Sequence, residues 1–375
     1  MRFSTLFAAA GVVGSAVAGA LPRGFSIPSG NGFPNPNPQQ EQKISLQAGG
    51  KLPGGPLPTQ LGPGSTIAFQ LIAFNELFET AFFNSLLYNI TNSVKGFEVP
   101  KDKRYEAENV IKTVLAQEEQ HAIGALATLK SANKFAPSPC KYKFPTSNLK
   151  DAISLAETFT AVVLGVLQDA NVIFSKEGLP EVVRLISAVI GQEGEQNGFY
   201  RLYLDQIPSE SPFLTTVPAA FAWSALQGFV VPGSCPEDIK NIKLPIFPPL
   251  LVNGGAIAKI KAKDQTLSFE ATLKVSKAAE KVIAYKAKTG GLYITYQTGL
   301  QLPKSVKAEN VRWVGNTIKL QARFPFNELV AGGFTHAALT TANNFQSVDD
   351  IPAHTLAAPG LIQVQEPISG KGYYN

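Results

Sequence analysis

Residues 65 to 204 contain four long stretches with apolar residues at helical spacing, and this feature constrains the fold most strongly. Turns rich in Pro, Gly, Ser and Asn separate the stretches, and such residues end one helix and begin the next. We expect helices over residues 65–94, 102–131, 149–175 and 180–204. Helices of this length joined by short connections are typical of a four-helix bundle.

The chain changes character after these helices. A shorter apolar helix is expected over residues 217–229, and a proline-rich stretch over residues 233–255 is interpreted as a linker. Beyond it, apolar and polar residues alternate with a period of two, first from Leu267 to Lys274 and again from Ile318 to Phe324. We therefore predict an α+β protein of two domains, with a helical bundle over residues 63–232 and a small antiparallel β-sandwich-like domain over residues 256–375.

The N-terminal residues are typical of an exported protein. Arg2 precedes a charge-free apolar run, and Ala18, Gly19 and Ala20 offer small residues for cleavage, so residues 1–20 are predicted to be a signal peptide. A transmembrane anchor is the alternative interpretation. Residues 21–62 are rich in Pro, Gly, Asn and Gln and predict an extended or disordered arm. We expect a secreted protein, extracellular or in the cell wall, with no membrane span in the mature chain.

The chain has two cysteines, Cys140 and Cys235, and each lies beside a proline in a polar stretch. Thiols of an exported protein meet oxidising conditions, so we predict that the two form a disulfide. Two unrelated free thiols are the alternative. A bridge between positions 95 residues apart would stabilise the fold by roughly 4 to 5 kcal/mol through the entropy of the unfolded chain.

Charge and sequence motifs suggest few binding partners. The net charge of +5 is interpreted as thinly spread without a dense basic run, which argues against a nucleic-acid partner. Lys259, Lys261 and Lys263 share one face of an expected strand and could bind cell-wall polysaccharide, but a solvated strand face is the simpler interpretation and the one we favour. Asn89 begins an Asn-Ile-Thr sequon for N-glycosylation near the end of an expected helix. No hydrolase motif is present.

The expected helix over residues 102–131 has an unusual inward face. Apolar residues from Ile111 to Leu129 mark the side that faces the bundle, and Glu118 and His121 fall within that side. Residues three positions apart lie about one helical turn apart on one face, so a carboxylate and an imidazole can reach the same metal ion. A buried carboxylate without a partner would be costly.

The other three helices carry acids in corresponding places. Glu76 and Glu79 interrupt an almost wholly apolar first helix, Glu157 lies within the third, and Glu193 within the fourth. Acids recurring at intervals of roughly 36 to 40 residues predict a common interior site. Ferritin-like di-iron carboxylate bundles use a lone Glu on two helices and a Glu-x-x-His motif on the other two. Glu76 or Glu79 matches the first lone Glu, and Glu118 with His121 matches the first Glu-x-x-His.

At these residues the chain resembles the secreted fungal ferritin-like family that includes late-sexual-development and starvation-stress-response proteins. The resemblance rests on "FNELFETAFF", "EEQHAIGAL", "LAETFTAVVLGVLQDA" and "GQEGEQNGFYR". It covers about residues 60–230 and extends more loosely through the β-rich part. More distantly, the chain is similar to bacterial and plant desiccation-related ferritin-like proteins. The resemblance implies a ferritin-like bundle and a role in stress, starvation or developmental response.

The second half of the chain departs from the ferritin-like pattern. The fourth helix has Gln196 where the second Glu-x-x-His would place histidine, and an amide is a poor metal ligand. The third helix has Thr160 where the distant relatives have Glu, which leaves Glu157 one turn away as a substitute. Of the three histidines in the chain, His336 and His354 lie in the β-rich part. The helices alone therefore cannot supply a symmetric centre with two histidines.

Three interpretations of the acidic cluster remain open. It could be a degenerate site, held as a hydrogen-bonded polar network without demonstrated catalysis. It could bind a single metal ion through Glu79, Glu118, His121 and Glu193, or it could be a working di-iron oxidase or iron-handling centre. Iron or manganese would suit ligation by several carboxylates and one imidazole, and zinc could also bind. The substrate, if any, and the oligomeric state do not follow from the sequence.

Overall fold

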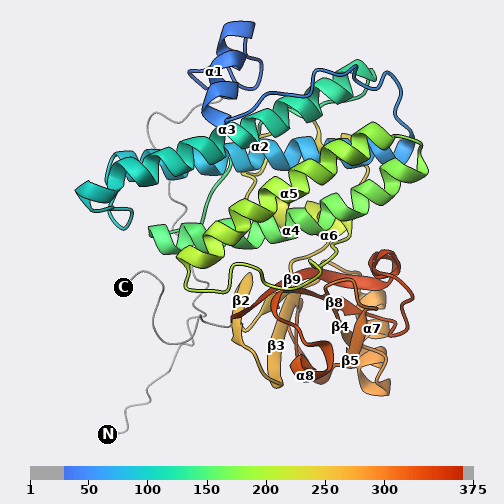
Figure 1. The fold of residues 1–375 in the computed structure, drawn as a ribbon. Coiled ribbons are helices and arrows are strands. Elements are labelled where there is room, and N and C mark those ends of the chain that lie inside the picture. The colour runs from blue at the N-terminus through green and yellow to red at the C-terminus, as the bar shows by residue number, and fades with distance from the viewer. Residues whose placement is uncertain (1–28, 366–375) are drawn as a thin grey trace, which may run out of the picture.

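The computed structural model describes residues 29–365, and it is an α+β protein with helices in the first part and two sheets in the second (Figure 1). The helical part comprises residues 29–230 and the β-rich part residues 250–365. The predicted signal peptide lies outside the described residues.

Four long helices form most of the helical part and confirm the four predicted segments. They are α2 (Pro63–Thr91), α3 (Lys101–Ser131), α4 (Leu149–Lys176) and α5 (Pro180–Tyr203). Proline in the first turn opens α2 and α5, where its missing N–H costs no hydrogen bond. Asn148 caps α4 by accepting a hydrogen bond from the backbone N–H of Asp151 at 2.9 Å.

The four long helices lie side by side above the β-rich part, and α6 (Ala219–Gln227) packs between α4 and the sheets (Figure 1). Helix α2 packs against both α3 and α4, and α4 packs against α5. Helix α6 confirms the short apolar helix expected over residues 217–229. By length and composition alone, α4 is the one helix among residues 29–365 that is apolar enough to cross a membrane. The sequence predicted no membrane span after the signal peptide. The 18-residue window of α4 is 67% buried inside the protein.

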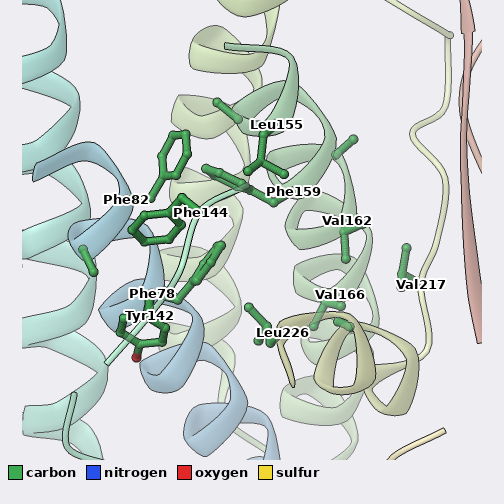
Figure 2. Close-up of a cluster of buried hydrophobic side chains, with 14 of the residues drawn as sticks. Phe78, Phe82, Tyr142, Phe144, Leu155, Phe159, Val162, Val166, Val217 and Leu226 are labelled. Atoms are coloured by element: carbon green, nitrogen blue, oxygen red, sulfur yellow. The ribbon is translucent and has the colours of Figure 1, made fainter. Parts of the chain in front are cut away.

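Aromatic side chains fill the space where α2, α4 and α6 meet (Figure 2). Phe78 of α2 contacts Tyr142 and Phe159 edge to face, with ring centroids 5.8 Å and 5.4 Å apart. Phe82 makes a similar edge contact with Phe144 at 5.2 Å. Aromatic pairs favour such geometry, and each adds about 0.5 to 1.5 kcal/mol beyond the area that it buries. The segment around Tyr142 thus belongs to the core although it is neither helix nor regular strand.

The N-terminal arm contains a helix, which corrects the expectation of an extended or disordered segment. Helix α1 (Pro38–Ala48) begins with a capping box in which Asn37 and Gln40 satisfy each other's backbone N–H groups. Ile44 and Phe33 are buried, and α1 packs along α3. The composition predicted disorder, but these two apolar anchors and the local capping residues outweigh it.

The β-rich part has two sheets that share one core. The four-stranded sheet, in the order β1-β3-β7-β6, contains β1 (Leu251–Val252), β3 (Gln265–Thr272), β6 (Glu309–Val314) and β7 (Thr317–Phe324). The five-stranded sheet, in the order β2-β9-β8-β4-β5, contains β2 (Ile257–Lys261), β4 (Tyr293–Thr298), β5 (Lys304–Lys307), β8 (Gly333–Thr340) and β9 (Thr355–Gln365). Tyr296 and Phe324 join the sheets with ring centroids 5.3 Å apart.

The prediction of an antiparallel domain is only partly right, because β2 and β9 pair in parallel. Strand β8 is buried on both faces. Phe334 and Ala338 pack with the helical part, whereas Ala337 and Leu339 face the core between the sheets. The period of two in a strand thus lets one element join both halves of the protein. The two halves share a buried interface.

Two further segments complete the description. Most residues of the expected linker over 233–255 are exposed or half-buried, but Ile242, Leu250 and Val252 are buried and β1 pairs with β3. Its predicted disulfide, Cys140–Cys235, is confirmed. Helix α7 (Lys277–Thr289) was not predicted, because the period of two in the flanking segments indicated strands only. It lies beside β4 and β5 (Figure 1). Short helices η1 (Ile239–Asn241), α8 (Phe326–Leu329), η2 (Val348–Asp350) and η3 (Pro352–His354) complete the described elements.

Candidate metal centre

Three helices bring four side chains that could hold a metal ion to one buried point. Glu76 comes from α2, Glu118 and His121 from α3, and Glu193 from α5. Each offers one ligand atom, and these atoms all lie within 4.8 Å of one another. The single histidine is central, because His121 Nδ1 lies 3.0 Å from Glu118 Oε2, 3.6 Å from Glu76 Oε2 and 3.8 Å from Glu193 Oε1. The spacing of Glu118 and His121 places both on the same face of α3, as predicted.

The acids of this cluster are deeply buried. The side chains of Glu118 and Glu193 are 0% exposed and that of Glu76 is 1% exposed, whereas His121 is 15% exposed. Burial raises the pKa of Glu76 to about 7. Burial, and then the charges of Glu76 and Glu118, raise the pKa of Glu193 well above its usual range. Several neighbouring acids therefore cannot all be ionised here without a compensating positive charge.

Histidine 121 supplies part of that charge. Burial lowers its pKa, but the hydrogen bond with Glu118 and the nearby carboxylate of Glu76 outweigh burial and raise the pKa well above the usual value. One protonated imidazole carries a single positive charge against three carboxyl groups. All three carboxyl groups can therefore ionise together only with a further cation nearby; without one, some of them stay protonated.

The hydrogen bonds of the cluster are incomplete. Gln196 donates to Glu118 Oε1 at 2.7 Å, and Tyr200 donates to Gln196 Oε1 at 3.3 Å. By contrast, both carboxyl oxygens of Glu76 and both of Glu193 are buried without a hydrogen-bond partner among the described residues. Buried polar atoms are nearly always paired in proteins, so these oxygens could bind a metal ion or another polar partner.

Glu79 lies next to the cluster and not among its four ligand atoms. Its side chain is buried, and Asn75 donates to its Oε1 at 3.1 Å. Burial, followed by the charges of Glu118, Glu193 and Glu76, raises its pKa well above the usual range. The sequence left Glu76 and Glu79 as alternatives, and the structure places Glu76 in the ligand set with Glu79 beside it.

Glu157 does not join the cluster, which corrects the expectation that all four helices contribute. Its Oε1 accepts a hydrogen bond from Arg201 at 3.0 Å, and the same guanidinium contacts Glu210 at 3.2 Å. All three side chains are at most 3% exposed. The buried arginine pairs with Glu157 Oε1, whereas Oε2 has no partner among the described residues, and Glu157 is not part of the group formed by Glu76, Glu118, His121 and Glu193. In the sequence, Arg201 lies among apolar residues near the end of α5, and this position could have predicted a buried cation for Glu157.

The other predicted site residues have simpler surroundings. Gln196 lies beside the cluster as a hydrogen-bond donor to Glu118, which agrees with an amide that does not bind metal. Asn89 is half-buried near the end of α2. Lys259, Lys261 and Lys263 are exposed at the edge strand β2 and the turn after it.

Two features of the centre were not predicted. Tyr200 lies one turn beyond Gln196 on the same face of α5, so the helical period could have identified it. Solvent can approach the cluster at the partly exposed His121. On the neighbouring surface of α3 the N-terminal segment is held by hydrogen bonds from Gln120 to Ser45 at 3.3 Å and from Gln117 to the backbone oxygen of Ala48 at 3.3 Å.

An open groove of about 450 Å³ lies away from the cluster, on the outer face of the four-stranded sheet. Its lining is mostly polar and includes Glu270, Asn310 and Arg312. It contains none of the cluster residues.

A scan of protein-family models finds no match to this chain, and no curated protein matches it.

Proposed function

We propose that this protein binds one divalent metal ion in a ferritin-like four-helix bundle, through Glu76, Glu118, His121 and Glu193. The observation that carries the proposal is the convergence of three buried carboxylates on one imidazole, with the oxygens of Glu76 and Glu193 unpaired. A divalent cation would balance the charges and occupy the unpaired oxygens.

The geometry fits a single ion. Ligand atoms about 2.1 Å from a metal lie at most about 4.2 Å from each other, so small rotations of the carboxylates would close the observed group around an ion. Three oxygen ligands and one nitrogen suit iron or manganese, and zinc accepts the same ligands. Glu79 is available as a further carboxylate. Because the acids must lose protons to bind metal, affinity should rise with pH.

A degenerate polar network is the competing function, and one specific observation favours it. Gln196 occupies the position of the second histidine and donates to Glu118, while Tyr200 donates to Gln196. This chain of hydrogen bonds replaces one possible ligand by a neutral group. It leaves the oxygens of Glu76 and Glu193 without partners, so the network explains less of the cluster than a metal ion does.

The biological setting belongs to the same proposal. The resemblance to secreted fungal ferritin-like proteins supports a secreted or cell-wall protein of stress, starvation or developmental response. Metal binding would serve iron handling or a metal-dependent oxidase reaction in that setting. The disulfide is compatible with export.

Metal analysis of the purified protein tests the proposal. The protein is stripped with a chelator, then titrated separately with Mn²⁺, Zn²⁺ and, without oxygen, Fe²⁺, and bound metal is measured after desalting. We expect one ion per chain, and none in His121→Ala. Circular dichroism checks that this variant folds. A wild-type protein that folds normally yet binds none of the three ions would favour the polar network.

A further inference from the structure

The positive charge of this protein is concentrated in one segment. Residues 274–307 contain seven lysines and one glutamate, which gives a net charge of +6, whereas the full chain carries +5. The sequence prediction of thinly spread charge is therefore wrong for this segment. It comprises α7 together with strands β4 and β5.

Five of these lysines lie on or against α7: Lys277, Lys281, Lys286 and Lys288 in the helix, and Lys307 of β5 at its C-terminal end. Lys307 of β5 lies against the end of the helix, because a side chain added at Gly290 would meet the Lys307 side chain at 2.6 Å. Lys281, Lys288 and Lys307 are exposed and have no acidic partner within 4 Å among residues 29–365. Lys277, by contrast, pairs with Glu280 at 2.7 Å. Lys281 and Lys288 lie about 10 Å apart along the helix axis, so the unpaired charges form a row rather than a point.

The apolar side of α7 is already occupied. Ile283 is buried in the core of the β-rich part, and Ala287 packs against the same core. The opposite side exposes Tyr285, of which 68% is accessible, and Val282, of which 56% is accessible, beside the lysines. A helix that binds a lipid surface needs a free apolar face, and α7 has used its apolar face for packing. Proteins that bind single-stranded nucleic acid present several aromatic rings for stacking, whereas this face offers one.

We propose that the exposed face of α7, with Lys281, Tyr285, Lys288 and Lys307, binds an acidic polysaccharide. The row of unpaired lysines complements regularly spaced carboxylates along an extended chain. Tyr285 lies between Lys281 and Lys288 on the same side of α7, and its exposed ring offers a flat apolar surface to a sugar ring. This inference does not depend on the metal centre.

Binding to polygalacturonate, a polymer of uronic acid, tests the proposal with the full protein. The test variant is the triple substitution Lys281→Gln, Lys288→Gln and Lys307→Gln. Its matched control is Lys259→Gln, Lys261→Gln and Lys263→Gln, which removes the same charge from exposed positions on and beside β2. Tyr285→Ala tests the ring without changing charge. Affinities are measured by calorimetry over a series of salt concentrations, and circular dichroism confirms folding.

We expect the α7 triple variant to bind at least tenfold more weakly and with a smaller salt dependence, and the control to change less than twofold. Tyr285→Ala should weaken binding at least threefold, and a neutral β-glucan should not bind. The proposal is overturned if the wild type does not bind polygalacturonate, or if both triple variants lose affinity equally. It also fails if Tyr285→Ala binds like wild type, or if anionic vesicles or single-stranded DNA bind more tightly than the polysaccharide.

Discussion

Glu118 and Glu119 are consecutive residues of α3, yet their side chains serve different parts of the protein. Glu118 faces the interior and contacts His121 and Gln196. Glu119 turns toward the N-terminal segment, where Asn31 donates to both of its carboxyl oxygens at 2.9 Å and 2.8 Å. Both are buried. This pair separates a candidate metal ligand from a structural carboxylate within one helical step.

The buried pair between Arg201 and Glu157 predicts a large effect on stability. Arg201→Met would leave Glu157 and Glu210 buried without their cation, which costs about 3 to 5 kcal/mol. Arg184→Met is the matched control on the same helix, because Arg184 is 80% exposed in its pair with Glu181 and should matter by less than about 0.5 kcal/mol. Urea unfolding measures both. Equal losses would show that the buried pair has no special role.

Removal of the disulfide should weaken the fold substantially. Cys140 and Cys235 are 95 residues apart, and a bridge across a loop of that length stabilises by about 4 to 5 kcal/mol through the unfolded chain. We expect Cys140→Ala with Cys235→Ala to lower the free energy of unfolding by that amount. Denaturant unfolding of the double variant, compared with the oxidised wild type, measures the difference. A loss below about 1 kcal/mol would contradict the entropic account.

His336 should make stability depend on pH. Burial lowers its pKa to about 4, although its hydrogen bond with the backbone oxygen of Thr216 opposes this. The unfolded chain binds a proton near pH 6.5 and the folded chain does not, so stability from this group falls as pH drops from about 6.5 to 4. The free energy of unfolding lost through His336 over this pH range is roughly 3 kcal/mol.

The measurement compares wild type with His336→Gln, because buried acids titrate in the same range with the opposite sign. Burial raises the pKa of Asp169 and of Glu157 to about 7. The contribution of each acid to the stability of the fold therefore falls as pH rises from the pKa of that acid in the unfolded chain toward 7. Subtracting the two profiles isolates His336. The same substitution at exposed His354 is the control. Parallel profiles for wild type and His336→Gln would contradict the prediction.

Much of the helical architecture follows from local sequence signals. Proline or asparagine marks the starts of α2, α4 and α5. The apolar stripe of α3 predicted that the face of this helix carrying Glu118 and His121 turns inward. These signals act within a few residues, so a single sequence carries them. The alternation of β3 and β7 likewise depends on neighbouring positions only.

The rest depends on contacts between distant residues. Glu157 has the same helical setting as the other acids, and only the packing of α5 brings Arg201 to it. The parallel pairing of β2 with β9 joins segments about a hundred residues apart. Helix α1 is stabilised by burial of Ile44, which local composition could not reveal. Each of these features is decided by a partner that the local pattern does not specify.

Metal content of the paired variants Glu118→Gln and Glu119→Gln tests the central claim most directly. Each removes one buried carboxylate from adjacent positions of α3, and Gln preserves shape in both. After chelation and reloading with Mn²⁺, elemental analysis should find about one ion per chain in wild type and in Glu119→Gln. Glu118→Gln should hold less than a tenth of that amount at the same free metal concentration. Equal metal content in the two variants, or none in wild type, would contradict a metal ion at Glu76, Glu118, His121 and Glu193.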